Sequence, residues 1–200
     1  MSFKSRKSYV VSSSLPNSPR RGEGRLLFLR LILFCLFLLA PHAVLADFSD
    51  HAHLISPPQK APPLVFEDAR QVQHTLSDYR GRFVLLNLWA TWCTPCVKEM
   101  PSLDALQKDM GVQLAVLPVS EDRGDTAVSA FYARHGLTQL PVAVDAAGIA
   151  PSAFQTKGLP TTFLIDPQGQ EVARFEGTVA WDSPEVLAFL RAQINATSHP

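Results

Sequence analysis

The segment that most restricts the fold is an almost entirely apolar run, Phe83–Trp89, which leads within four residues into a Cys-Thr-Pro-Cys sequence. A run of this kind is typical of a strand that is buried on both faces of a sheet. Residues 94–110 then have helical spacing, with apolar residues on one face and Gly111 just past the end. A second apolar run, 112–119, follows. The order strand, helix, strand predicts a β-α-β unit at the centre of an α/β domain.

The segments on either side of this unit complete the domain. An N-terminal hairpin, an insert after the β-α-β unit and a C-terminal hairpin are predicted; their strands are 64–66, 72–76, 140–144, 161–165 and 171–175. The further predicted helices are 125–135, 149–156 and one that starts at Pro184 with Ser183 as its N-cap. The prediction is therefore a three-layer α/β fold, a central mixed sheet flanked by helices, over 62–194, with a short tail at 195–200.

The first 46 residues have the composition of an export segment. They hold seven of the chain's 18 Lys and Arg and one of its 18 acidic residues, which leaves 11 basic and 17 acidic residues in 47–200. An apolar stretch, Leu26–Ala40, follows the basic part, and Ala43–Ala46 has small or short residues where a signal peptidase cuts. An uncleaved membrane anchor is the alternative, because 26–46 is just long enough to cross a bilayer. In both cases the domain is exported, to the periplasm or the extracytoplasmic face of the inner membrane.

Residues 47–61 are expected to be a proline-rich linker between the export segment and the domain, since they show no hydrophobic periodicity.

Composition also excludes two kinds of function. The domain has a net charge of about −6 and no basic run, so a nucleic-acid-binding surface is not expected. A zinc site needs two ligands besides the cysteines, and neither a second C-x-x-C nor an H-x-x-x-H is present, so no metal is expected.

Cys93 and Cys96 are the two cysteines that remain once the leader, with Cys35, is set aside. In an oxidising compartment a lone C-x-x-C pair is either a structural disulfide or a redox centre. A bridge that closes so short a loop stabilises little, which favours the redox centre. No cofactor other than the redox-active Cys93–Cys96 disulfide is expected.

The predicted position of the cysteines assigns them different roles. Cys93 falls at the N-cap of a helix, where unpaired N–H groups and the helix dipole stabilise a thiolate. Cys96 lies about one turn further in and is expected to be less exposed. The prediction is that Cys93 attacks a partner disulfide and Cys96 resolves the mixed disulfide. Pro95 suits the first helical turn, where a missing N–H costs nothing.

Other residues near the pair have two interpretations each. Glu99 follows Cys96 by three residues on the same helix face, and either moves protons for the resolving thiol or is a solvated helix residue. Pro160 enters a predicted strand and either holds a cis peptide bond or is an ordinary loop proline. The expected substrate-binding residues are Trp92, Thr94, Pro95, Leu159, Pro160 and Thr161.

The sequences FVLLNLWATWCTPCVKEMPSLDALQ and GLPTTFLIDPQGQEVARFEG strongly resemble the TlpA/ResA family of extracytoplasmic thiol–disulfide oxidoreductases, and the likeness covers nearly all of 62–193. The resemblance implies a thioredoxin fold, with Pro160 as a cis-proline facing the cysteines and Glu99 as the acidic residue near them. It also implies a reductase that serves apocytochrome c or copper-site proteins and is recharged by a membrane electron donor of the DsbD/CcdA type. Asn87 stands where thioredoxins keep a buried Asp, so Glu99 is the remaining candidate for the proton relay.

Two alternatives remain open at this point. The first is a thiol oxidant or isomerase of the DsbA type, because the direction of exchange depends on donor and acceptor as much as on the domain. The second, from a different class, is a copper chaperone of the Sco type, although such proteins use C-x-x-x-C with a distant His. The client protein and the oligomeric state do not follow from the sequence.

Overall fold

The computed structural model describes residues 51–197. The predicted signal peptide or anchor over 1–46 lies outside the described residues, as does Cys35. Within 51–197, no helix combines the length and the hydropathy needed to cross a membrane.

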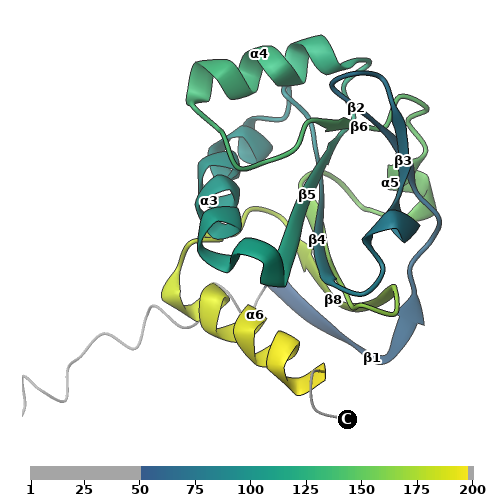
Figure 1. Cartoon of the computed structure of the whole chain (residues 1–200), viewed down its shortest axis with the longest axis vertical. Helices are drawn as coiled ribbons and strands as arrows, with labels where there is room; N and C mark the ends of the chain where they lie inside the picture. The colour runs from purple at the N-terminus through teal and green to yellow at the C-terminus, as the bar shows by residue number, and fades with distance from the viewer. Residues whose placement is uncertain (1–50, 198–200) are drawn as a thin grey trace, which may run out of the picture. The chain divides into compact units, whose positions relative to one another are not determined.

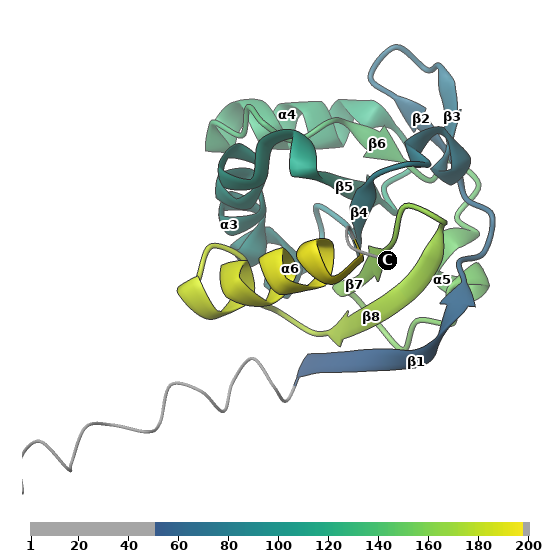
Figure 2. The ribbon, with the colours of Figure 1, turned by 60° about the horizontal axis from the view of Figure 1, so that its bottom comes forward.

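The described residues form one eight-stranded sheet in the order β1-β8-β7-β4-β5-β6-β2-β3 (Figure 1). Its strands are β1 (Ala52–Lys60), β2 (Val65–Asp68), β3 (Gln73–Thr75), β4 (Phe83–Trp89), β5 (Leu114–Ser120), β6 (Ala143–Val144), β7 (Thr161–Ile165) and β8 (Gln170–Glu176). The central pairs β4–β5 and β5–β6 are parallel, while β7, β8 and β1 add antiparallel on one side and β2 and β3 on the other. Figure 2 shows β1 beside β8 at one edge and the β2–β3 hairpin at the opposite edge. The mixed sheet predicted from the sequence is confirmed.

The central β-α-β unit lies where the sequence placed it. β4 has the predicted bounds and is buried along its whole length. Helix α3 (Thr94–Met110) also has the predicted bounds. Its C-cap is Gly111, whose φ of 55° is a backbone conformation that residues other than glycine rarely adopt. β5 starts two residues later than predicted because a 3-10 turn, η3 (Gly111–Gln113), comes first.

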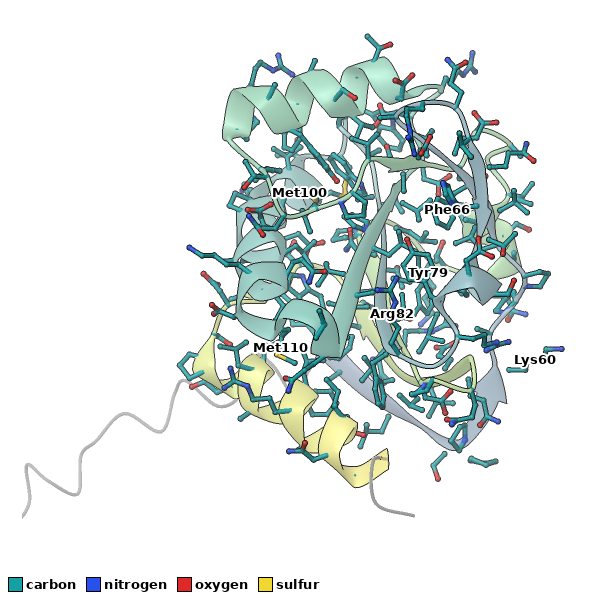
Figure 3. The ribbon with its side chains drawn as sticks, in the orientation of Figure 1. Lys60, Phe66, Tyr79, Arg82, Met100 and Met110 are labelled. Atoms are coloured by element: carbon teal, nitrogen blue, oxygen red, sulfur yellow. A yellow bond between two sulfur atoms is a disulfide. The ribbon has the colours of Figure 1, made fainter. Side chains whose placement is uncertain are left out.

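Helices cover both faces of the sheet, so the domain has three layers. α3, α4 (Asp125–His135) and α6 (Pro184–Thr197) share one apolar cluster with the sheet, and α5 (Ala150–Ala153) belongs to a second cluster on the other face. β4 alternates between the two clusters, with Leu85 in the first and Leu86 in the second. Figure 3 shows Met100 and Met110 on α3, and Phe66 and Tyr79 across the sheet from them. Tyr79 belongs to the 3-10 turn η2 (Leu76–Tyr79).

The predicted domain boundaries are wrong at both ends of the domain. Residues 52–60 of the predicted linker form β1, paired with β8. Seven of its nine residues are exposed, and the two half-buried ones lie three positions apart. The sequence of this edge strand therefore has no alternation of apolar and polar residues from which a strand could be predicted. Main-chain hydrogen bonds to β8 hold it in place. The predicted tail is partly helical, because α6 runs on to Thr197. Its start is as predicted, with the Ser183 hydroxyl accepting a hydrogen bond from the Val186 amide at 3.3 Å.

Candidate active site

Cys93 and Cys96 form a disulfide at the start of α3. Cys93 is the N-cap residue, and its sulfur accepts a hydrogen bond from the Cys96 amide at 3.4 Å. The first turn of the helix carries no acidic side chain. Cys93 keeps 7% of its surface exposed, whereas Cys96 is fully buried. The pair therefore has an outer sulfur next to unpaired helix N–H groups and an inner sulfur shielded from solvent, which is the asymmetry that a stabilised outer thiolate requires.

The loop that leads into Cys93 is held by an aspartate that the sequence analysis did not identify. The Asp122 carboxylate accepts hydrogen bonds from the Thr91 amide at 2.8 Å and the Thr91 hydroxyl at 2.7 Å. The Ser120 hydroxyl donates to the same carboxylate at 2.6 Å. Asp122 is the second residue after β5, and residues just past the carboxyl ends of neighbouring parallel strands meet at one sheet edge. The position of Asp122 and of its neighbour Glu121 just after a predicted parallel strand could have identified both as candidates for the site.

Glu99 is buried behind the disulfide, with 2% of its surface exposed. The Asn87 amide group on β4 donates to Oε1 at 2.8 Å. The other oxygen, Oε2, accepts from the Val179 amide and from the Trp181 indole N–H, both at 3.2 Å. Asn87 also donates to the Thr162 hydroxyl on β7 at 2.9 Å. Glu99 is therefore not a solvated helix residue, and of the two interpretations that the sequence left open, the solvated one is wrong.

Burial controls the protonation of Glu99. Loss of solvent is the largest effect and raises its pKa from 4.5 to about 7, although the hydrogen bonds from Val179, Asn87 and Trp181 act in the opposite direction. A carboxyl group with a pKa near neutrality is present in both protonation states under ordinary conditions. It is suited to accept and return a proton.

This shift predicts that the protein loses stability as the pH rises from about 4.5 to about 7. The native Glu99 keeps its proton in that range while the unfolded one releases it, so the unfolded state binds fewer protons. The loss reaches at most about 3 kcal/mol for a shift of this size. Urea unfolding of the oxidised protein at several pH values measures it. Glu99→Gln should remove the share of this slope that Glu99 contributes, while Glu121, whose pKa burial also raises to about 7, keeps its own share. A curve that stays parallel to the native one would contradict the assignment.

The peptide bond between Leu159 and Pro160 is cis, as the resemblance implied. Pro160 directly precedes β7, and its carbonyl accepts a hydrogen bond from the Gly177 amide at 3.0 Å. The Thr161 hydroxyl donates to the Gly158 carbonyl at 2.7 Å, which closes the turn before the proline. Leu159 packs against the apolar cluster that contains both cysteines. The proline loop and the disulfide therefore contact the same cluster.

The predicted substrate-binding residues differ in accessibility. Trp92 is 68% exposed, and Thr94 and Pro95 are also exposed, on the first turn of α3. Leu159 is half-buried, and Pro160 and Thr161 are buried. Trp92 and Leu159 line one open hollow of about 440 Å³. Within residues 51–197, no group of three or more His, Cys, Asp or Glu side chains is arranged to hold a metal ion.

Comparison with known proteins agrees with this geometry. The model of the AhpC/TSA family matches residues 57–173, more than half of the chain. The chain belongs to the AhpC/TSA family. Among its relatives in that family, thiol-disulfide oxidoreductase ResA of Geobacillus kaustophilus is 34% identical over 168 residues, which cover 82% of this chain and 95% of the relative. ResA of Bacillus subtilis is 38% identical over 128 residues, 62% of this chain and 70% of the relative.

Comparison with solved structures gives the same result. A putative thiol:disulfide interchange protein DsbE from Chlorobium tepidum has a TM-score of 0.58 and 30% identity, over 70% of this chain and 95% of that one. The thioredoxin fold and the relation to ResA expected from the sequence are confirmed. This member of the AhpC/TSA family is a thiol–disulfide oxidoreductase.

Proposed function

We propose that the enzyme reduces protein disulfides, with Cys93 as the attacking sulfur and Cys96 as the resolving one. The observation that carries this proposal is the disulfide at the start of α3, with Cys93 as N-cap and Cys96 fully buried. A thiolate at a helix N-terminus is stabilised by the helix dipole, and the thiolate is the form that attacks disulfides.

The exchange runs in two steps. In the reduced enzyme the Cys93 thiolate attacks one sulfur of a client disulfide, a mixed disulfide forms, and the other client sulfur leaves as a thiolate that takes up a proton. Cys96 then loses its proton and attacks the Cys93 sulfur. The Cys93–Cys96 disulfide forms, the second client sulfur leaves as a thiolate, and the client gains two electrons that the enzyme loses.

Glu99 is the proposed base for the second step. It lies one helical turn after Cys96, and its Oε1 accepts one hydrogen bond, so a lone pair remains for the Cys96 proton. Above a pH of about 7 the carboxyl group is ionised and able to accept that proton. Its burial among Asn87, Val179 and Trp181 fixes its position without a contact to the client.

The proposed partners follow the resemblance to the TlpA/ResA family. The clients are apocytochrome c or copper-site proteins, and a membrane electron donor of the DsbD/CcdA type returns the enzyme to the dithiol form. The exchange needs no cofactor besides the Cys93–Cys96 disulfide. The proposed location is the periplasm or the extracytoplasmic face of the inner membrane, which the basic and then apolar leader supports.

The redox potential of the Cys93–Cys96 pair tests the direction of exchange. Equilibration with glutathione buffers, followed by alkylation and mass spectrometry, measures the fraction of dithiol at each buffer potential. A reductase should lie near the value of thioredoxin, about −270 mV. A potential near that of DsbA, about −120 mV, would overturn the proposal and favour the oxidant instead.

A further inference from the structure

The open hollow of about 440 Å³ lies between the two loops that border the redox pair. Trp92, directly before Cys93, lines one side, and residues 156–159, directly before the cis proline, line another. Pro151 and Glu121 complete the lining. The hollow therefore lies beside the route of a client segment that brings its cysteine to Cys93, because Trp92 directly precedes Cys93 and Leu159 directly precedes the cis proline.

Glu121 is the unusual residue of the hollow. It follows β5, and its amide donates to the Trp89 carbonyl at 2.8 Å, which holds its backbone next to the loop that leads to Cys93. One oxygen of its carboxyl group, Oε1, is buried and has no hydrogen-bond partner within the described part of the chain. A buried acceptor without a donor costs stability, so a positive charge placed next to this carboxyl group would be stabilising.

The neighbouring charged groups leave Glu121 without a counterion. Asp122 accepts its hydrogen bonds from Ser120 and Thr91, and Asp145 accepts from the amides of Gly148 and Ala150. Both aspartates add negative potential at Glu121, and with the larger effect of burial they raise its pKa to about 7.

The nearest cation of the hollow is already paired. The Lys157 ammonium group forms an ion pair with Glu176 at 3.1 Å, and no ion pair joins it to Glu121 among residues 51–197. The hollow thus presents an uncompensated carboxyl group next to the exposed Trp92 ring. A carboxylate beside an aromatic face suits an arginine or lysine side chain, whose stem packs on the ring while its N–H groups reach the carboxylate.

We infer that this hollow is a specificity subsite of the redox centre, in which Glu121 receives a basic side chain of the client close to the client's reacting cysteine. The inference rests on the proposed disulfide reduction, and it adds a preference for clients that have a basic residue near the reacting cysteine. Arginine fits best, because its planar guanidinium group stacks on Trp92 while its N–H groups reach the Glu121 carboxyl group from the open hollow.

Reduction of peptides that differ in one charge tests the subsite. Each peptide contains one cysteine, which forms a mixed disulfide with 2-mercaptoethanol. The peptides differ at a single position, one to three residues before or after that cysteine, which is occupied by Arg, Gln or Glu. The reduced full-length protein, in excess over each peptide, is mixed with it at pH 8 and low salt. The second-order rate constant of this single turnover follows from mass spectrometry of quenched samples. At the best position, the Arg peptide should react about tenfold faster than the Glu peptide. Glu121→Gln should reduce this ratio to within about twofold.

Asp109→Asn is the matched control, since it removes one carboxylate from an exposed site at the far end of α3 and should leave both the rates and the ratio unchanged. Equal rates for Arg and Glu peptides at every position would overturn the subsite, as would a preference that Glu121→Gln leaves intact or an equal slowing of all peptides by that variant. Failure of the native protein to reduce any peptide would instead count against the proposed reductase.

Discussion

Replacing Cys93 with serine is expected to abolish disulfide reduction, with a loss of more than roughly 10³-fold in rate, because the hydroxyl group supplies no thiolate at neutral pH. Cys96, the other sulfur of the pair, cannot substitute for it, since its side chain is fully buried. Insulin reduction, followed by turbidity with dithiothreitol as the electron source, measures the loss. A Cys93→Ser protein that keeps substantial activity would overturn the assignment of the attacking sulfur.

The companion variant Cys96→Ser should have a different result. It keeps the Cys93 thiolate at the N-cap of α3 but lacks the sulfur that releases the client, so mixed disulfides accumulate. Non-reducing gels of the exported fraction, followed by mass spectrometry, identify the trapped clients. The Cys93→Ser, Cys96→Ser double variant is the control and should trap nothing. If it traps the same proteins, the adducts do not arise at this site.

The second large effect is expected for Glu99→Gln. Removing the base should slow the resolution of the mixed disulfide by about 10²-fold, the lower range for a positioned proton acceptor. In the native enzyme this rate should rise with pH through about 7, as Glu99 ionises. In the variant that limb disappears, because no carboxylate is left at this position to accept the Cys96 proton.

Stopped-flow measurement of client release from pH 5 to 9 gives both profiles. Glu99→Asp, which keeps a carboxyl group, should recover part of the rate and keep a limb with its own pKa. Asp109→Asn, on the last turn of the same helix, should reproduce the native profile. A folded Glu99→Gln protein with an unchanged pH profile would show that Glu99 has only a structural role.

The parts of this site that the sequence predicts are the local ones. β4 and α3 have the predicted bounds because a doubly buried strand, an N-cap and a C-terminal glycine all act within a few residues of the chain. Cys93 and Cys96 obtain their relative position from that same local geometry. The cis bond at Pro160 was different, since the sequence around the proline favours an ordinary loop proline, and only the distant C-x-x-C pair and the family resemblance indicated cis.

The parts that the sequence did not predict depend on distant contacts. Glu99 owes its burial to Val179 and Trp181, about 80 residues further along the chain, and nothing in the spacing of α3 indicates them. Asp122 and Thr91 lie 31 residues apart and meet only because β4 and β5 are parallel neighbours. Glu121 was missed for the same reason.

The composition of β1 affects the tendency of this enzyme to aggregate through its exposed sheet edge. An outermost strand offers free N–H and C=O groups on which another chain can build. β1 contains Pro57 and Pro58, which have no N–H to donate, and it ends at the charged Lys60. Its pairing with β8 is also irregular between Leu54 and Gln59. These features discourage edge-to-edge aggregation, so crowded molecules of this enzyme stay separate along this side.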